Sequence, residues 1–494
     1  MTKWYDNIVI KEVEKMENWL VKRAQITPNR VAVTMAHQDM TFAEVAQKAN
    51  HIAGKISSLK DCNARVALIM TNNVAGYLII MALQQLGKTI VFINRRLSVD
   101  EINYQLSDAG VTLLLTDDDY TQALQIKQQI RFSDLPDGEP IIPVTAFPDD
   151  FVTSVMYTSG TTSQPKGVMQ TYKNHFYSAM GSAINLGLSA QDAWLAVVPI
   201  FHISGFSILM RSLIYGMRVV LVEKFDSQAI NELLIHDGIT TMSVVPVMLK
   251  QLLAALPDDV NYNSHFRAML LGGGPTDLAT LQKAQLHKLP VIQSYGMTET
   301  ASQVVALDSA DIVKKMQSVG KPLFPVSITI RDQDGQPADQ GNIWIKSPTL
   351  TVGYLNKPQK LLQNMHDGWF DTEDFGYLDE DGFLYVQGRQ GDMINSGGEN
   401  IFPDEVESAY AKMPGLDDIV VIGIPDDVWG AVPVAIVSGT GLSSDSLRQF
   451  GREKLAHYKV PQSFYQAKYW HRTASGKVQR QQFKADLDAL EILK

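Results

Sequence analysis

Short apolar runs alternate with amphipathic stretches through the first two-thirds of the chain. The runs at 65–70, 89–94 and 111–118 are rich in Val, Ile and Leu, as expected for strands that are buried on both faces. The stretches between them, such as 74–87, have the length and apolar character of buried helices. Strands that alternate with helices predict parallel sheets covered on both faces. Ligands bind such sheets at the carboxyl ends of the strands.

Two predicted helices begin with a capping signature. Thr41 stands before an amphipathic stretch with Glu44 three residues later, and Ser98 stands before another with Glu101 three residues later. In each pair the side chains can satisfy backbone N–H groups at the helix start. Residues 119–150 have a weaker pattern and more Pro and Asp, so we expect a surface connection there.

The pattern changes beyond residue 305. Short strands at 326–332, 341–347 and 382–388 are separated by turns, which predicts an antiparallel sheet or a small barrel. The C-terminal segment mixes helices and strands over about a hundred residues, the size of a separate domain. We therefore expect an α/β protein. Its large N-terminal domain, 1–390, would hold parallel and mixed sheets with flanking helices and a small barrel-like subdomain, and 391–494 would form a small, mobile α+β domain.

Composition limits the classes of protein that fit. A chain of 494 residues with 45% hydrophobic and 19% charged residues suits a globular protein of two or more domains. The net charge of −10, without a basic tract, argues against nucleic-acid binding. The first 20 residues are charged throughout, and no apolar run is long enough to span a bilayer. Cys62 is the single cysteine, which excludes an intrachain disulfide. We expect a cytoplasmic protein, and a homo-oligomer stays open.

The segment FVTSVMYTSGTTSQPKGVM, at 151–169, carries the strongest chemical signal. An apolar strand leads into a loop that combines hydroxyl groups, a glycine and a lysine. Phosphate oxygens require many donors and a cation, and this loop offers both. It is not a Walker A sequence, because Lys166 follows a proline and precedes Gly167. An ordinary polar hairpin turn is the alternative. The candidate phosphate ligands are Thr158, Ser159, Gly160, Thr161, Thr162 and Lys166.

Three further segments hold groups suited to a nucleotide or a substrate. PIFHISG places His202 in a bend between Pro and Gly, although a lone histidine in an apolar loop is more often structural. LLGGGP, at 270–275, removes the side chains at a strand end, which suits either a bulge or a flat ligand. QSYGMTET, at 293–300, offers an aromatic ring, a hydroxyl and Glu299, a hard oxygen ligand of the kind Mg²⁺ prefers. The alternative for Glu299 is a solvated acid in a capped turn.

Charged residues follow in the C-terminal half. Asp374 can accept hydrogen bonds from both ribose hydroxyls, and Arg389 is a permanent cation with planar donors. Gly391 has the widest backbone freedom of any residue type, so a large rotation is easy there. In RTASGKVQR a Ser-Gly turn projects Lys477, which by itself would read as a solvated surface lysine.

These segments, taken in their order along the chain, resemble the adenylate-forming enzymes, a family of acyl-CoA synthetases, adenylation domains and luciferases. The resemblance covers nearly the whole chain. It implies that the loop 158–166 holds the β- and γ-phosphates of ATP and that Glu299 holds Mg²⁺. Lys477 would bridge the substrate carboxylate and the α-phosphate. The C-terminal domain would then turn about Gly391, and the SGGEN edge would guide the thiol of coenzyme A to the acyl-adenylate.

The resemblance also assigns contacts residue by residue. The nucleotide would contact Gly272, Gly273, Gly274, Pro275, Ser294, Tyr295, Gly296, Met297, Thr298, Asp374 and Arg389. The acyl substrate would contact His202, Ser204 and Gly205. Coenzyme A would contact Gly397, Gly398, Glu399 and Trp429, although a core aromatic explains Trp429 equally well.

The chain departs from the family pattern at four positions. Ser163 and Glu373 each stand where the family has glycine, and Asn395 stands where it has an apolar residue or Lys. Gly391 occupies the hinge position, which is commonly Asp or Lys. The extra charge of Glu373 would weaken nucleotide affinity if it faces the ribose.

Two stretches, 174–221 and 270–305, resemble most the branch of the family that activates o-succinylbenzoate in menaquinone synthesis. The second carboxylate of that acid needs donors, for which His202, Ser204 and Arg211 are candidates, although helical phase could turn Arg211 outward. Three alternatives stay open: another aryl- or acyl-CoA ligase, an adenylating enzyme that loads a carrier protein, and a non-catalytic nucleotide-binding relative.

Overall fold

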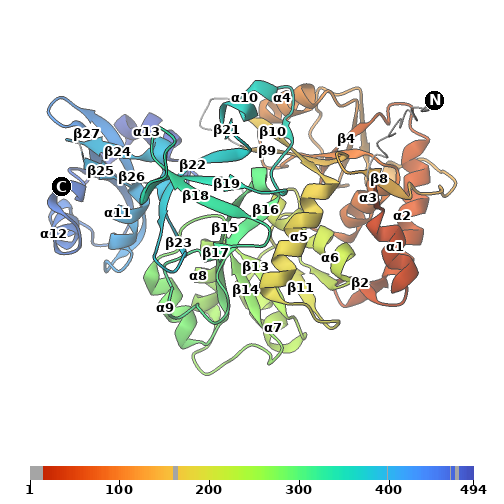
Figure 1. The fold of residues 1–494 in the computed structure, drawn as a ribbon, viewed down its shortest axis with the longest axis horizontal. Helices are drawn as coiled ribbons and strands as arrows, with labels where there is room; N and C mark the ends of the chain where they lie inside the picture. The colour runs from red at the N-terminus through yellow and green to blue at the C-terminus, as the bar shows by residue number, and fades with distance from the viewer. Residues whose placement is uncertain (1–14, 159–164, 398, 468, 473–477) are drawn as a thin grey trace, which may run out of the picture.

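The computed structural model describes residues 15–158, 165–397, 399–467, 469–472 and 478–494 (Figure 1). Within these ranges, sheets of seven and nine strands occupy the N-terminal part of the chain with helices packed against them. A five-stranded antiparallel sheet follows, and a six-stranded sheet with its own helices forms the C-terminal part. The α/β class and the separate α+β region predicted from the sequence are confirmed.

The seven-stranded sheet contains the buried strand that leads into the candidate phosphate-binding loop. Val, Ile and Leu runs form its parallel centre, and β10 joins antiparallel to β9, with Lys166 opposite Thr158. The capping boxes at Thr41 and Ser98 are confirmed at the starts of α2 and α4. The strands are β4 (Arg65–Ile69), β5 (Thr89–Phe92), β6 (Leu113–Thr116), β7 (Gln128–Arg131), β9 (Val152–Thr158), β10 (Lys166–Thr171) and β20 (Gly353–Tyr354). The helices are α2 (Phe42–Ser57), α3 (Val74–Gln85) and α4 (Val99–Ala109).

The expectation of a plain surface connection over 119–150 is partly wrong. Residues 128–131 form β7, which extends the sheet in parallel beside β6. The sequence Gln-Gln-Ile-Arg has little apolar pattern because an edge strand needs less buried surface than a central one. A second short strand, β8 (Ala146–Pro148), pairs with β1 (Lys15–Glu17).

The nine-stranded sheet brings several candidate segments to one edge. β11, β13, β14 and β15 run parallel, so the segments that leave their carboxyl ends lie on the same side. The strands are β2 (Val31–Met35), β3 (Gln38–Thr41), β11 (Ala193–Ala196), β12 (Arg218–Leu221), β13 (Thr241–Val244), β14 (Ala268–Leu271), β15 (Val291–Met297), β16 (Ser302–Ala306) and β17 (Lys321–Pro322). The helices of this region are α1 (Trp19–Ile26), α5 (Tyr172–Leu186), α6 (Ile203–Tyr215), α7 (Ser227–His236), α8 (Pro246–Ala255) and α9 (Leu278–Leu286).

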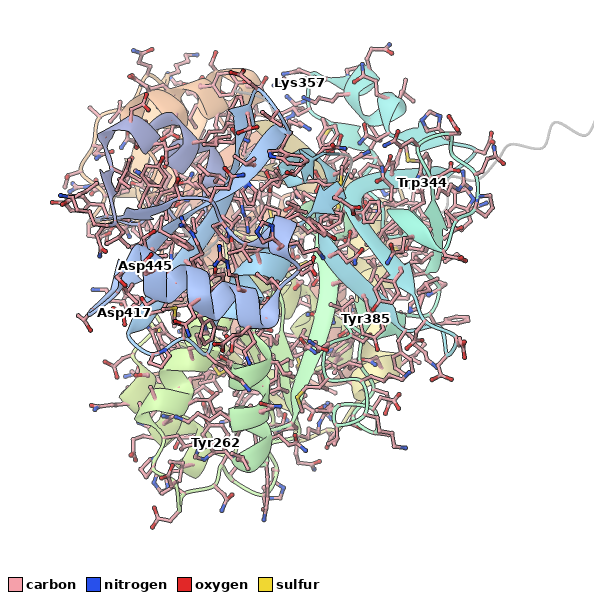
Figure 2. All side chains as sticks on the ribbon, turned by 90° about the vertical axis from the view of Figure 1, so that its left-hand side faces the viewer. Tyr262, Trp344, Lys357, Tyr385, Asp417 and Asp445 are labelled. Carbon is pink, nitrogen blue, oxygen red and sulfur yellow. The ribbon has the colours of Figure 1, made fainter. Side chains whose placement is uncertain are left out.

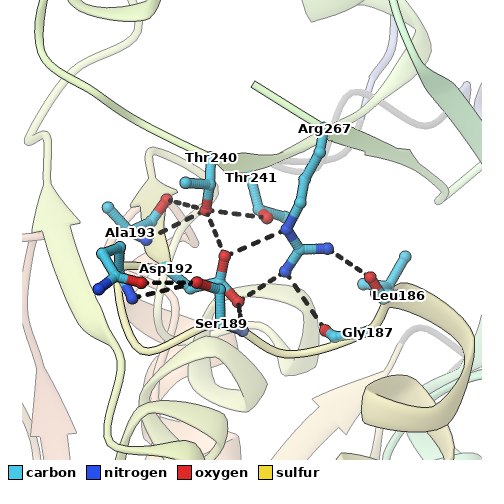
Figure 3. Close-up of polar contacts among 9 residues, drawn as sticks. Leu186, Gly187, Ser189, Asp192, Ala193, Thr240, Thr241 and Arg267 are labelled. Carbon is cyan, nitrogen blue, oxygen red and sulfur yellow. Dashed lines mark hydrogen bonds and ion pairs between the residues drawn. The ribbon is translucent and has the colours of Figure 1, made fainter. Parts of the chain in front are cut away.

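An ion pair ties the opposite edge of this sheet together (Figure 3). Arg267, just before β14, donates to both carboxylate oxygens of Asp192, just before β11, at 3.1 and 2.6 Å. The hydroxyl of Thr240, just before β13, donates to the same carboxylate at 3.0 Å. Such a two-pronged pair fixes geometry as well as charge. These contacts therefore fix the amino ends of three parallel strands relative to one another. They lie at the edge of the sheet opposite the candidate segments.

The last two sheets lie side by side at one end of the molecule. Figure 2 views that end, with Asp417 and Asp445 on the near C-terminal part and Trp344 and Tyr385 on the antiparallel sheet beside it. The antiparallel region holds β18 (Ser327–Arg331), β19 (Gln340–Lys346), β21 (Met365–His366), β22 (Trp369–Leu378), β23 (Leu384–Arg389) and α10 (Pro358–Gln363). The C-terminal part holds β24 (Ile394–Ser396), β25 (Glu399–Ile401), β26 (Leu416–Asp426), β27 (Gly430–Gly439), β28 (Phe464–Gln466), β29 (Glu491–Ile492), α11 (Pro403–Tyr410), α12 (Ser444–Lys454) and α13 (Arg480–Ala485).

The C-terminal part contacts the rest of the molecule through side chains on both. The rings of Phe375 and Phe402 stack with their centroids 4.9 Å apart. Lys412 donates a hydrogen bond to the side-chain oxygen of Gln282 on α9 at 3.2 Å. None of the helices in the described ranges is long and apolar enough to cross a membrane.

Candidate active site

A buried carboxylate joins the end of β15 to the antiparallel sheet. The hydroxyl of Tyr295 donates to Oδ2 of Asp374 at 2.7 Å, and Nε of Arg389 lies 3.3 Å from Oδ1. Burial, and then the charge of Asp374, raises the pKa of Tyr295 well above its usual value, so the tyrosine stays a neutral donor. Burial lowers the pKa of Arg389, but Asp374 and Glu299 outweigh that effect and raise it. The three predicted nucleotide contacts therefore form one cluster.

Glu299 lies near Lys166, the first residue of the strand that follows the candidate phosphate-binding loop. Its Oε1 accepts a hydrogen bond from the hydroxyl of Tyr354 at 3.0 Å. The ammonium of Lys166 lies over the Tyr354 ring, 5.0 Å from the centroid. Burial and Lys360 lower the pKa of Lys166, while the charges of Glu299 and Glu373 act in the opposite direction. The structure thus brings the predicted phosphate-binding cation and the predicted magnesium ligand together.

The donors around Glu299 fit a magnesium ion held mainly by its substrate. Among the described residues, no three His, Cys, Asp or Glu side chains gather as a metal site. Mg²⁺ usually keeps several waters and takes one or two carboxylates together with phosphate oxygens. A single carboxylate near Lys166 matches that requirement, and a bound Mg²⁺ would neutralise phosphate charge there.

Glu373 adopts a backbone conformation that suits the glycine it replaces. Its φ is +61°, in the left-handed region that side chains other than Gly, Asn and Asp rarely enter. Its backbone N–H donates to Asp371 at 2.9 Å, and its carboxylate accepts from Asn364 at 3.3 Å. The left-handed backbone conformation therefore explains why the family has glycine at this position. The charge of Glu373 also acts to raise the pKa of Lys166, although burial lowers that pKa overall.

The predicted adenine-binding segment forms an exposed turn at the carboxyl end of β14. Gly273 has φ +87° and is exposed, as are the two residues after it. A Cβ on Gly272 would lie 3.1 Å from the hydroxyl oxygen of Ser294 on the neighbouring strand. A Cβ on Gly296 would overlap the backbone of Ser302 at 2.2 Å. Gly296 is thus required by hairpin packing, whereas Gly273 and Gly274 leave an open backbone surface. Pro275, Met297 and Thr298 border the same edge.

His202 is the residue directly before α6, and its side chain makes no capping hydrogen bond. Its Nε2 is buried and has no hydrogen-bond partner among the described residues. Burial, together with the charge of Arg96, lowers its pKa to about 4, so the ring is neutral near pH 7. A Cβ on Gly205 would lie 2.4 Å from the carbonyl oxygen of Pro199, so this glycine lets the helix start against the bend. Ser204 is half-buried in the same turn.

Sequence reasoning did not identify Asn72, whose side chain holds the bend before α6 through two hydrogen bonds. Its Oδ1 accepts from the N–H of Ile200 at 2.9 Å, and its Nδ2 donates to the carbonyl of Val198 at 3.0 Å. The side chain is 4% exposed. The position of Asn72 after the buried strand β4 was the available signal, because residues at the carboxyl ends of such strands gather at the binding edge.

The side chain of Arg211 points into the protein, so helical phase does not turn it outward. It is 1% exposed, and its Nη2 donates to Ser302 at 3.0 Å and to Gln303 at 2.7 Å. Its Nε and the Nδ1 of the buried His175 lack hydrogen-bond partners within the described residues. Burial and the charge of Arg211 lower the pKa of His175 to about 3. A buried cation whose hydrogen bonds go to neutral oxygens favours an anionic ligand.

The C-terminal candidates occupy two places. Gly391 lies in a short turn directly after β23. Gly397 has φ +62°, and a Cβ there would lie 2.7 Å from the ring of Trp429, which is 53% exposed. The exposed ring and Glu399 flank this glycine edge, so Trp429 is not a core aromatic. The candidates Ser159, Gly160, Thr161, Thr162, Gly398 and Lys477, and the departure Ser163, lie outside the described residues.

The chain belongs to the AMP-binding enzyme family. It matches the AMP-binding enzyme domain over residues 20–355 and the AMP-binding enzyme C-terminal domain over residues 405–477. Among its relatives is the 2-succinylbenzoate–CoA ligase of Listeria monocytogenes, which is 43% identical over 475 residues covering 95% of this chain and 99% of the relative.

Solved structures of o-succinylbenzoate coenzyme A synthetase (MenE) from Bacillus subtilis share the fold. The complex with the acyl-adenylate OSB-AMP has a TM-score of 0.90 and 38% identity, covering 95% of this chain and 98% of that one. The complex with ATP and a magnesium ion also scores 0.90, with 38% identity and coverage of 95% and 100%. A double mutant bound to the product analogue OSB-NCoA scores 0.75, with 37% identity and coverage of 97% and 100%.

Proposed function

We propose that this protein is an AMP-forming 2-succinylbenzoate–CoA ligase of menaquinone synthesis, acting in the cytoplasm. It converts o-succinylbenzoate, ATP and coenzyme A into o-succinylbenzoyl-CoA, AMP and pyrophosphate. Identity of 43% across nearly the full length of a relative with that name supports the assignment. The observation that carries it is the convergence of Lys166, Glu299 and the Asp374 cluster at one edge of the sheets.

The first step forms the acyl-adenylate. A carboxylate oxygen of the substrate attacks the α-phosphorus of ATP, and pyrophosphate leaves with the electron pair of the broken P–O bond. Several negative charges meet in this step, so cations placed in advance lower the barrier. Lys166 and the phosphate loop bind the β- and γ-phosphates, and Lys477 contacts both reacting groups. Asp374 accepts the ribose hydroxyls, and Tyr295 together with the 272–275 turn binds the adenine.

The second step forms the thioester. The C-terminal part rotates about Gly391, which moves Lys477 away and brings the Gly397 edge and Trp429 toward the acyl-adenylate. The sulfur of coenzyme A attacks the acyl carbonyl, AMP leaves, and the thiol proton passes to solvent or a nearby base. The higher TM-score with the acyl-adenylate complex than with the product-analogue complex, at nearly equal identity, supports the adenylate-forming arrangement for the present structure.

The acyl pocket is built for an anion. Arg211 supplies a buried positive charge next to Ser302 and Gln303. His202 supplies a buried nitrogen on the adjoining bend, and its low pKa keeps it neutral. Both features favour an acid that carries a second carboxylate over benzoate or a fatty acid.

ATP–pyrophosphate exchange with a panel of acids tests the proposal. We expect exchange with o-succinylbenzoate at a rate well above that with benzoate, octanoate or an amino acid, and thioester formation with free coenzyme A. Exchange that favours an acid without a second carboxylate would assign a different CoA ligase. Acyl transfer to a carrier protein but not to coenzyme A would assign a carrier-loading enzyme, and no exchange with any acid would indicate a non-catalytic relative.

A further inference from the structure

Gly391 is unconstrained in the present arrangement. A Cβ built there would meet no atom within 4 Å, and its φ lies outside the left-handed region. Neither packing nor backbone conformation therefore requires a glycine. The residues before and after Gly391 are instead held by two different parts of the molecule.

Gln390, on the N-terminal side, is held by the antiparallel sheet. Its Oε1 accepts a hydrogen bond from Nδ2 of Asn342 at 3.1 Å. Asn342 lies on β19, is 8% exposed, and donates the same amide to Oδ2 of Asp371 on β22 at 3.1 Å. A buried amide with several bonds is costly to displace, because its groups would be left unpaired. Gln390 therefore stays with the sheet.

Asp392, on the C-terminal side, is held by the C-terminal part. Its Oδ2 lies 4.0 Å from Nη1 of Arg480 on α13. Arg480 also pairs with Asp404 and, at 2.8 Å, with Glu407 on α11. Glu407 in turn accepts from the N–H of Val421 on β26 at 2.8 Å. These contacts tie Asp392 to a helix and a strand of the C-terminal sheet.

We propose that Asn342 and Arg480 are positioning residues that restrict the domain rotation to the backbone of Gly391. The inference rests on the proposed two-step function and adds the contacts that make a single residue the pivot. When only one residue can rotate and both of its neighbours are fixed, the C-terminal part can adopt few orientations relative to the rest of the molecule. If several residues could rotate, it would adopt many.

A double-mutant cycle tests the restriction. Gly391→Pro should spare adenylation, because proline fits the first turn of a helix, and should slow thioester formation by at least about tenfold because φ is fixed. Gln390→Met removes the acceptor for Asn342 and keeps the side-chain length. Combined with Gly391→Pro, it should restore thioester formation at least in part, because residue 390 can then turn. The matched control is Gln38→Met at an exposed position of β3, which should restore nothing.

Asp392→Asn tests the other side by removing the attraction to Arg480, with Asp119→Asn, which removes a surface pair with Arg95, as its control. It should also partly restore the Gly391→Pro enzyme. Strictly additive effects for both Gln390→Met and Asp392→Asn would overturn the proposal.

A conformational measurement separates this inference from the proposed function. Dyes on Asp258→Cys and Asp445→Cys, in a Cys62→Ser background, report the distance between the two parts by single-molecule energy transfer. We expect a few narrow distances in the parent protein and a broadened distribution after Gln390→Met or Asp392→Asn. Distributions of unchanged width would refute the restriction even if the enzyme were active. Absence of exchange with every acid, with the expected broadening, would refute only the proposed function.

Discussion

The side-chain amide of Gln170 donates a hydrogen bond to the backbone carbonyl of Thr298 at 2.9 Å. Gln170 is itself fixed, because its Oε1 accepts from the hydroxyl of Ser154 at 2.8 Å, and Nε2 of His175 lies 3.1 Å from that hydroxyl oxygen. All three side chains are buried. This chain of polar groups connects the strands of the phosphate loop to the turn that carries Glu299.

Replacing Gln170 with Leu should therefore weaken the adenylation step. The variant removes one hydrogen bond from the Thr298 carbonyl, which keeps the Ala301 N–H, and one from the Ser154 hydroxyl, which keeps His175. Each lost bond costs about 0.5–1.5 kcal/mol. We expect a lower pyrophosphate exchange rate and a need for more Mg²⁺, because Glu299 is less well positioned. The control is Gln84→Leu, another buried glutamine, whose amide contacts the sulfur of Met210. It should lose stability without any change in the Mg²⁺ dependence; an equal change in both variants would contradict the role of Gln170.

Replacing Glu373 with Gly should raise both stability and ATP affinity. A left-handed backbone costs a residue with a side chain about 1–2 kcal/mol, and glycine loses about 0.5–1 kcal/mol through its freedom in the unfolded chain. Urea unfolding should show a small net gain. The KM for ATP should fall, because a negative charge near Lys166 is removed. Glu373→Gln separates the effects: its KM should fall without the gain in stability. An unchanged KM in both variants would show that the charge has no influence on ATP.

The sequence predicted the elements whose pattern is strong and local. The buried helix α3, the two capping boxes and the antiparallel strands after residue 305 all agree with the structure, because burial and capping are written in neighbouring residues. The edge strand β7 was missed because exposure removes the apolar pattern that identifies a strand.

The site was predictable where a single motif holds the chemistry. Tyr295, Asp374 and Arg389 were each named from their own segment, and the structure supplies the contacts among them. Asn72 and Gln170 were not named, because each acts through a backbone carbonyl or N–H more than a hundred residues away, and such pairing leaves no mark in the local sequence.

The buried His175 should make the protein less stable as the pH falls below 7. Its folded pKa of about 3 lies below the value near 6.5 expected in the unfolded chain, so only the unfolded state takes up a proton between these values. Stability is complete above pH 6.5, and this residue removes about 2 kcal/mol by pH 5. His202 acts in the same direction. Urea unfolding at pH 7 and pH 5 should show a smaller loss for His175→Gln than for the parent; identical losses would contradict the assigned shift.

Replacing Asn72 with Ala should weaken binding of the acyl substrate more than binding of ATP. The bend that carries His202 loses its bond to the Ile200 N–H, so the imidazole is less well positioned. We expect a higher KM for the acid, a nearly unchanged KM for ATP, and a stability loss of about 1–3 kcal/mol. Asn231→Ala removes a similarly buried amide that bonds the carbonyl of Leu252. It should lose stability with no change in either KM, and a selective rise in the KM for ATP in Asn72→Ala would disprove the interpretation.

Replacing Lys477 with Ala should separate the two half-reactions. In the proposed mechanism the lysine neutralises charge while the carboxylate attacks ATP, whereas thioester formation from a supplied acyl-adenylate follows after the lysine has moved away. Pyrophosphate exchange should therefore fall by about 10²-fold or more, the scale expected when a group that stabilises developing charge is lost. Thioester formation from synthetic acyl-adenylate should be nearly unchanged. Lys484→Ala, at an exposed position of α13, serves as the control and should alter neither step. Equal losses in both half-reactions for Lys477→Ala would mean that the lysine supports the fold or the rotation and not the attack on ATP.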